Sequence, residues 1–235
     1  MLDFQSYKDN LGFIHLGKNP TGPSDNAVLY TAQSYMLDFI NKTSCFDKDD
    51  LAGLFKKAEV LPGLHDKYPS LKKMNSHDNQ IGMLASLRVL SEGWSNTKQY
   101  ESMKNIYLYG EDNGYNYNNI MPAVKEPTSL RQGYVIAFIK MCVGREPSIW
   151  FKAWFILAIL LSVIKNLIND TRYTSSIILS KMMLIALSWD RNWNVLHGFF
   201  NIFVNMSKIA DIYYPKGHPI IEQWKKYEKE IRKTK

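Results

Sequence analysis

Residues 24–40, SDNAVLYTAQSYMLDFI, form the stretch of this chain in which helical periodicity is clearest. Apolar and aromatic side chains recur there every three or four residues, at Val28, Leu29, Ala32, Tyr35, Met36, Phe39 and Ile40. That spacing places them on one face of an α-helix. Ser24 and Asp25 stand just ahead of the run, and both residue types are favoured N-caps. The sequence therefore predicts a helix that begins at this polar pair and buries one side.

The same spacing recurs along most of the chain. We expect further helices over about 47–61, 76–90, 98–108, 130–143, 148–168, 174–188, 192–213 and 218–233. No strand-like alternation of useful length appears. Residues 1–23 end in a run of Pro and Gly and are expected to form an N-terminal loop segment, whereas residues 220–235 form a basic C-terminal helix. The predicted fold is all-α: a single domain over residues 1–235 of antiparallel helical hairpins, which can arrange as an incomplete (α/α) toroid.

Composition limits the class of protein. The chain has 235 residues, of which 46% are hydrophobic and 22% charged, and this excludes a disordered tail, a collagen-like repeat and a small disulfide scaffold. The formal net charge is +7, and residues 225–235 alone contribute +4. Cations at the end of a terminal helix are favoured by the helix dipole. Few aromatic residues accompany them, so nucleic acid is not favoured as a partner.

Membrane and redox signals are weak. The most apolar run, residues 153–164, has 12 residues, whereas a membrane span needs roughly 20. We therefore expect a buried core helix there, and no membrane partner. The first ten residues, MLDFQSYKDN, lack the basic and apolar regions of a signal peptide, which favours a soluble protein. Cys45 and Cys142 have neither a CxxC nor a zinc spacing, and no cofactor is expected.

Two polar helix starts echo each other. Asp25-Asn26 and Asp78-Asn79 lie 53 residues apart, and each pair stands at the beginning of a predicted helix. Asp, Asn and Ser are ordinary N-caps, and this interpretation stays open. In a toroid of helical hairpins, however, the inner helices begin at one rim. Asp25 and Asp78 could then serve as a general acid and base, while the imidazole of His77 titrates near neutral pH and can move protons.

The landmarks around the second copy carry a resemblance. Residues 62–69, PGLHDKYP, and 75–79, NSHDN, resemble uncharacterised proteins of tailed bacteriophages over roughly residues 24–90. The hairpin repeat is also similar in architecture to (α/α) toroid glycosidases and polysaccharide lyases. These resemblances imply a phage protein in the host cytoplasm or the virion, and a carbohydrate-active hydrolase or lyase. Asp25, Asp78 and His77 would be its catalytic residues, and Asn26, Asn79 and His65 would bind the polysaccharide or glycan.

Tyrosine and asparagine alternate after the fourth predicted helix. Tyr115 and Tyr117 lie among Asn113, Asn116, Asn118 and Asn119 in a predicted long loop. Exposed tyrosine rings can stack on sugars while amides bond hydroxyl groups, so Tyr115 and Tyr117 are further candidates for substrate binding. The same composition also suits contacts between proteins.

Two alternatives to the enzyme stay open. The first is a non-catalytic virion or host-interaction protein that contacts other virion proteins; a large apolar patch in place of a cleft would favour it. The second is a metal-dependent hydrolase that uses His65, Asp66, His77 and Asp78, since imidazole and carboxylate together suit zinc or iron.

Overall fold

The computed structural model describes residues 2–23, 26–69, 76–92, 95–117, 130–189 and 193–233. In these residues the chain is mostly helical, with one small hairpin of strands. The elements are η1 (Gln5–Tyr7), α1 (Ala27–Asn41), α2 (Asp50–Ala58), β1 (Glu59–Leu61), β2 (Leu64–His65), α3 (His77–Leu90), α4 (Thr97–Asp112), α5 (Leu130–Cys142), α6 (Ile149–Leu167), η2 (Thr171–Tyr173), α7 (Thr174–Ser188), α8 (Asn194–Phe203), α9 (Met206–Tyr213) and α10 (Pro219–Lys233). The predicted helical class is confirmed.

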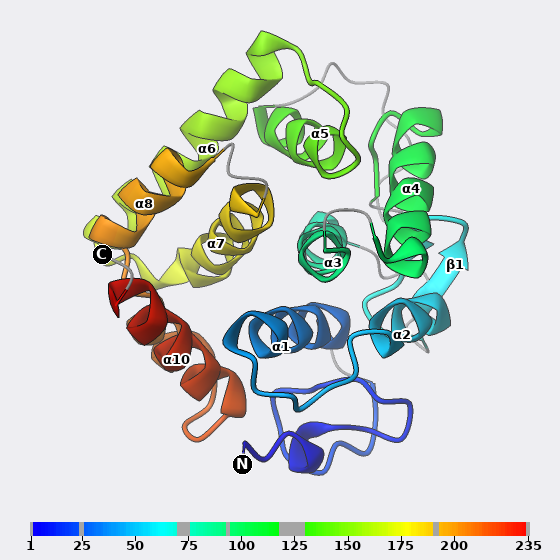
Figure 1. Ribbon diagram of the computed structural model, residues 1–235, viewed down its shortest axis with the longest axis vertical. Coiled ribbons are helices and arrows are strands. Elements are labelled where there is room, and N and C mark those ends of the chain that lie inside the picture. The colour runs from blue at the N-terminus through cyan, green and yellow to red at the C-terminus, as the bar shows by residue number, and fades with distance from the viewer. Residues whose placement is uncertain are drawn as a thin grey trace.

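The helices from α1 to α7 alternate between an inner and an outer layer. The inner helix α3 contacts α1, α5 and α7, and Figure 1 shows it end-on with these three around it. Nearly all residues of α1, α3 and α7 are buried, because each has neighbours on several sides. The helices α2, α4 and α6 lie outside this layer, and α8, α9 and α10 complete the outer side next to α7 and α1.

Close packing joins α1 to α3. A side chain at Gly82 of α3 would place its Cβ 2.4 Å from Cδ1 of Leu29, so glycine allows the two helices to approach. Polar side chains on these buried helices bond within their own helix: Thr31 Oγ1 donates to the carbonyl of Ala27, and Ser34 Oγ donates to that of Tyr30. Such local bonds satisfy hydroxyl groups that water cannot reach.

The C-terminal helix α10 is held to α1 by buried amides. Gln33 Oε1 accepts from the Tyr214 hydroxyl at 2.6 Å and from Trp224 Nε1 at 3.2 Å. Asn41 Nδ2 donates to Oε1 of Gln223 at 2.5 Å. The two ends of the chain therefore share one core, since residues about 180 positions apart in sequence pair inside it.

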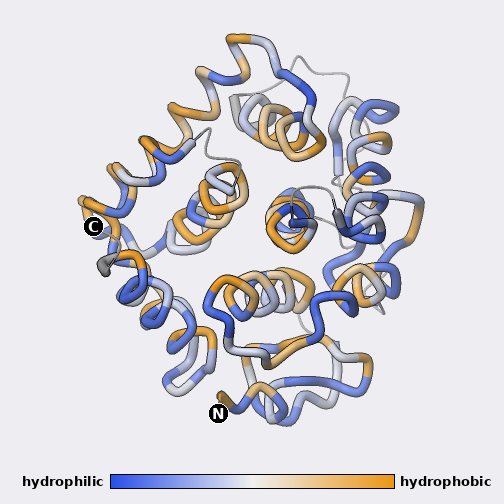
Figure 2. Tube along the Cα trace, in the orientation of Figure 1, coloured by the Kyte–Doolittle hydropathy of each residue, from blue (hydrophilic) through white to orange (hydrophobic). Residues whose placement is uncertain are grey.

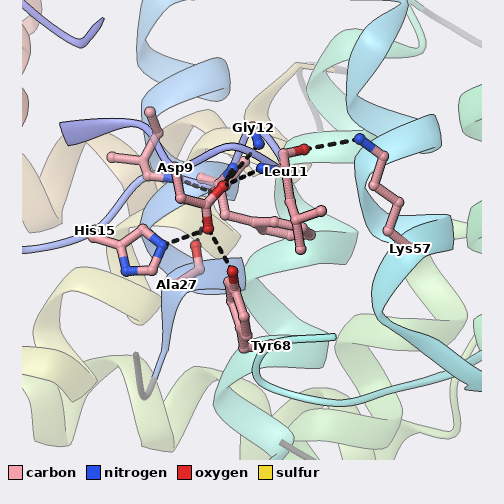
Figure 3. A network of polar contacts seen from close by, with 10 residues as sticks. Asp9, Leu11, Gly12, His15, Ala27, Lys57 and Tyr68 are labelled. Carbon is pink, nitrogen blue, oxygen red and sulfur yellow. Dashed lines mark hydrogen bonds and ion pairs between the residues drawn. The ribbon is translucent and has the colours of Figure 1, made fainter. Parts of the chain in front are cut away.

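The N-terminal segment is irregular, as predicted, but it contributes to the core. Phe4, Tyr7, Phe13 and Ile14 are buried. Its fold depends on Asp9, whose Oδ1 accepts the backbone N–H groups of Leu11, Gly12 and Phe13 at 2.8–2.9 Å. Figure 3 shows Oδ2 between His15 and Tyr68, at 2.7 Å from His15 Nε2 and from the Tyr68 hydroxyl. Burial acts to raise the pKa of Asp9, but the hydrogen bonds from His15 and Tyr68 outweigh it and leave that pKa below its usual value.

Three predicted helices differ from the structure. The helix expected over 47–61 begins at Asp50 and ends at Ala58, and the chain then turns back as β1 and β2, with β1 antiparallel to β2. The helix expected over 192–213 is two helices, because Val204 is extended and Asn205 caps a new start by accepting the N–H of Lys208 at 3.0 Å. The helix expected to end near residue 108 continues to Asp112.

The turn between β1 and β2 gives a direct test of the fold. Gly63 has a φ of +82°, and a Cβ there would lie 2.1 Å from the carbonyl oxygen of Asn105 in α4. We expect Gly63→Ala to lower the free energy of unfolding by roughly 2–4 kcal/mol. The strain of a positive φ at alanine and the clash of its Cβ with the Asn105 carbonyl both destabilise the folded state. Urea unfolding followed by circular dichroism measures this change.

Gly53→Ala is the matched control. Gly53 lies in α2 and a Cβ there meets nothing within 4 Å. This substitution should raise the free energy of unfolding by about 0.5–1 kcal/mol, since alanine favours a helix over glycine. Equal effects of the two substitutions would contradict the turn geometry.

Candidate functional site

The start of α3 carries the densest group of predicted site residues. Ser76 is the N-cap, and its hydroxyl accepts the N–H of Asn79 at 3.3 Å. Asp78 is exposed and His77 is half-buried, whereas Asn79 is fully buried. Both amide atoms of Asn79 lack a hydrogen-bond partner among the described residues. One polar start therefore contains an accessible carboxylate next to a buried amide.

The start of α1 is built differently. Asn26 is its N-cap, with a left-handed φ of +70° and no side-chain cap, and α1 begins at the next residue. Asp25 lies outside the described residues. In α3, by contrast, Asp78 and Asn79 are the second and third helical residues. Asn26 and Asn79 therefore have different positions relative to their helices, although they occur in the same sequence pattern.

Tyr213 of α9 is influenced by residues of both helix starts. The Tyr213 ring of α9 lies 6.4 Å from the Tyr30 ring in the first turn of α1. Burial raises the pKa of Tyr213, and the Asp78 carboxylate adds to that increase by its negative charge. Asp78 thus acts on a ring that contacts α1. The expected pairing of Asp25 with Asp78 stays a prediction, because Asp25 lies outside the described residues.

The other candidates for substrate binding are more buried than we expected. His65 is 3% exposed, and burial lowers its pKa to about 4 although the Glu59 carboxylate opposes this. Tyr117 is fully buried, and its hydroxyl donates to the carbonyl of Ile106 at 2.6 Å. Its ring meets that of His77 at 6.2 Å, and Tyr115 is half-buried. The expectation of an exposed ring is wrong for Tyr117, which packs the end of α4 instead.

Asp78 lines neither of two grooves that lie on the described part of the chain. A groove of about 710 Å³ lies between the N-terminal segment and α2, with Asn10, Gly12, Asp50 and Gly53 on its walls. A groove of about 350 Å³ is lined by Asp38, Lys42 and other residues near the end of α1. Within the described part of the chain, no three His, Cys, Asp or Glu side chains lie close enough to hold a metal ion. The geometry therefore gives the metal hypothesis no support.

The outer helix α6 has an apolar outer side. Its sequence contains only two charged residues, Lys152 and Lys165. Exposed apolar side chains recur along it at helical spacing: Ile149, Trp150, Ile156, Leu157, Leu161, Ile164, Leu167 and Ile168. The expectation of a buried core helix over 153–164 is wrong for this outward side. By length and composition α6 could also cross a membrane, with 22% of its most apolar window buried.

The helix α8 extends this surface. It contacts α6, and Asn166 Nδ2 donates to the carbonyl of Phe203 at 2.8 Å. Figure 1 shows both helices along the same outer edge, and Figure 2 shows the hydrophobic colour there. Val195, Phe199, Ile202 and Phe203 are exposed on α8, with Val195 at 90%. We call these four residues and the eight of α6 the α6–α8 face.

The size of the α6–α8 face is unusual. Its twelve side chains are between 39% and 90% exposed. A fully exposed large side chain presents on the order of 150–200 Å², and these twelve are on average about half exposed, so together they present on the order of 1,000 Å² of accessible surface. The largest apolar patch of a typical monomer is about 300–600 Å². The sequence alone contained no signal for it, because an apolar helix is expected to be enclosed and only the structure places α6 in the outer layer.

A buried lysine lies beneath α8. Lys181 of α7 is fully buried, with its Nζ 2.8 Å from His197 Nε2 and donating to Asn201 Oδ1. Tyr227 of α10 completes the group, with its hydroxyl 3.0 Å from the same His197 nitrogen. Burial drives the pKa of Lys181 well below its usual value, although Glu228 opposes this. Burial and the charge of Lys181 lower the pKa of His197 to about 3.

Comparisons with known proteins add no assignment: no family model, no curated protein and no solved structure matches this chain.

The buried Lys181 makes a stability prediction. In the unfolded chain this amine is protonated below pH of about 10.5, whereas in the folded protein its lowered pKa disfavours the charge. Between the lowered pKa of the folded state and about 10.5, the folded state therefore binds fewer protons than the unfolded chain. The free energy of unfolding falls as the pH decreases through this range. We expect Lys181→Met to raise the free energy of unfolding at pH 7 by about 1–3 kcal/mol. The gain should be smaller at pH 9, and urea unfolding at both pH values measures it.

Lys208→Met serves as the control, since Lys208 is exposed on α9. It should change the free energy of unfolding by less than about 0.5 kcal/mol. A loss of stability in Lys181→Met at every pH would show that the contacts with His197 and Asn201 fully compensate the buried amine.

Proposed function

We propose that this protein is a non-catalytic interaction protein that binds another protein through the α6–α8 face. The observation that carries the proposal is that α6 and α8 lie in the outer layer and yet expose uncharged, apolar side chains on their outward sides. Exposed apolar area of this size, bordered by polar surface, is typical of a protein or membrane contact. The resemblance to tailed-phage proteins supports a virion or host-interaction role.

The cations near the face favour a protein over a bilayer. A peripheral helix on an anionic membrane uses free lysines and arginines beside its apolar side. On α6, Lys152 instead pairs with the Glu146 carboxylate, and Lys165 Nζ lies 3.7 Å from the centre of the Tyr173 ring. On α8, His197 is the one titratable residue, and it is turned toward Lys181. Side chains of this chain thus engage both lysines of α6, and α8 adds no lysine or arginine.

A second candidate function rests on the α3 start. The packing of Leu29, in the first turn of α1, against Gly82, in the second turn of α3, supports a position of the two helix beginnings near one another. The alternation of inner and outer helices supports an incomplete (α/α) toroid. In that arrangement Asp25 and Asp78 would act as acid and base on a glycan, with His77 and Asn79 beside them.

A cross-linking experiment tests the first proposal. A photoreactive phenylalanine derivative is placed at Ile202, which is 67% exposed on the face, and in a second sample at Leu108 on the outer helix α4. In cells that produce the protein, we expect the Ile202 probe to form a protein adduct. The adduct should disappear when Leu161→Glu is added, because a charge on the face prevents docking. The Leu108 probe should give no such adduct. Adducts with lipid alone would contradict the proposal.

Product release from bacterial polysaccharides separates the two candidates. Reducing ends and unsaturated uronates are measured for the wild type, Asp78→Asn and Asp50→Asn. Asp50 is the matched control, since it is exposed in the first turn of α2 as Asp78 is in α3. A non-catalytic protein releases nothing in all three samples, and this is our expected result. Release that is lost only in folded Asp78→Asn would establish the enzyme and overturn the non-catalytic proposal.

A further inference from the structure

We infer that a second copy of this chain covers the α6–α8 face, in a two-fold symmetric dimer. This inference rests on the proposed function, because it names the partner of the same face. It depends on the area of the face, its lack of charge and its composition.

The area is sufficient for a stable dimer. A standard protein interface buries about 800 Å² on each partner. The twelve side chains of the face present on the order of 1,000 Å², so one copy can supply a whole half of such an interface. In a two-fold dimer the same patch is used twice, and no second surface is required.

The lack of charge on the face allows two copies of it to pack together. The chain has a net charge of +7, so two copies repel one another unless their charges stay apart. Neither α6 nor α8 contains an acidic residue, and the only Lys or Arg residues of the two helices are Lys152 and Lys165. Lys152 and Lys165 are held by Glu146 and by the Tyr173 ring. Two α6–α8 faces can therefore meet without burying an unpaired cation.

The composition also indicates a permanent contact between copies. The face is built entirely of aliphatic and aromatic residues, including Trp150, Phe199 and Phe203. Interfaces of obligate homodimers are more apolar than those of transient complexes, and they resemble a divided core. A transient partner would in addition leave this surface exposed to water for part of the time.

The mass of the purified protein in solution tests the inference. The monomer has a mass of 27.3 kDa. Sedimentation and light scattering over a wide dilution series should give twice that value for the wild type. Leu161→Glu and Ile202→Glu, on α6 and α8, should each weaken the dimer on the order of a hundredfold. Leu108→Glu is the matched control, because Leu108 is 43% exposed and Leu161 is 46%. It should leave the dimer intact, and circular dichroism verifies that all variants fold.

The other outcomes are distinct. A dimer that persists in both face variants would use another surface and overturn the inference. If the wild type stays monomeric while its Ile202 probe cross-links a different protein, the inferred dimer is overturned and the proposed function stands. A monomer that floats with vesicles of phosphatidylcholine and phosphatidylserine, and loses this in Leu161→Glu, would overturn both.

Discussion

The enclosure of α3 by α1, α5 and α7 is the constraint on which the rest of the structure depends. A helix with neighbours on so many sides can expose polar groups to water only at its ends. Small residues such as Gly82 are needed where α1 approaches. Buried polar side chains on α3 can bond only within the protein: Gln80 Nε2 donates to the carbonyl of His65, whereas the Asn79 side-chain amide has no partner among the described residues. The polar start of α3 is therefore the place where this central helix contacts solvent.

The inner layer also determines the character of the outer helices. An outer helix has one side on the core and one in water, so its stable pattern is amphipathic. The helix α10 follows this rule, with Ile220 and Trp224 inside and Lys225 and Lys229 toward solvent. The helix α6 does not, since its outward side is as apolar as its inward side. Because these side chains point away from the core, folding of a single chain does not explain their apolar character.

Much of the fold could be predicted from the sequence. The helix expected over 174–188 lies at those residues, and the bounds of α3 and α10 differ from prediction by one residue. The break at Asn205 was missed because apolar spacing continues across it, although an asparagine cap was visible. The exposure of α6 could not be predicted, since an apolar run does not say which neighbours will cover it. The burial of Tyr117 depends equally on a tertiary contact with Ile106.

The polar group beneath α8 connects the core with the exposed face. Apolar contacts alone would let α8 lie on α7 in several similar positions, because such contacts have little direction. The contacts of Lys181 with His197 and Asn201 are directional, and His197 is also bound to Tyr227 of α10. Burying the Lys181 amine costs stability. The buried amine also restricts α8 to the one position in which His197 and Asn201 both reach it. Val195, Phe199 and Ile202 lie on the opposite side of the same short helix, so a contact inside the protein sets which side chains the face presents.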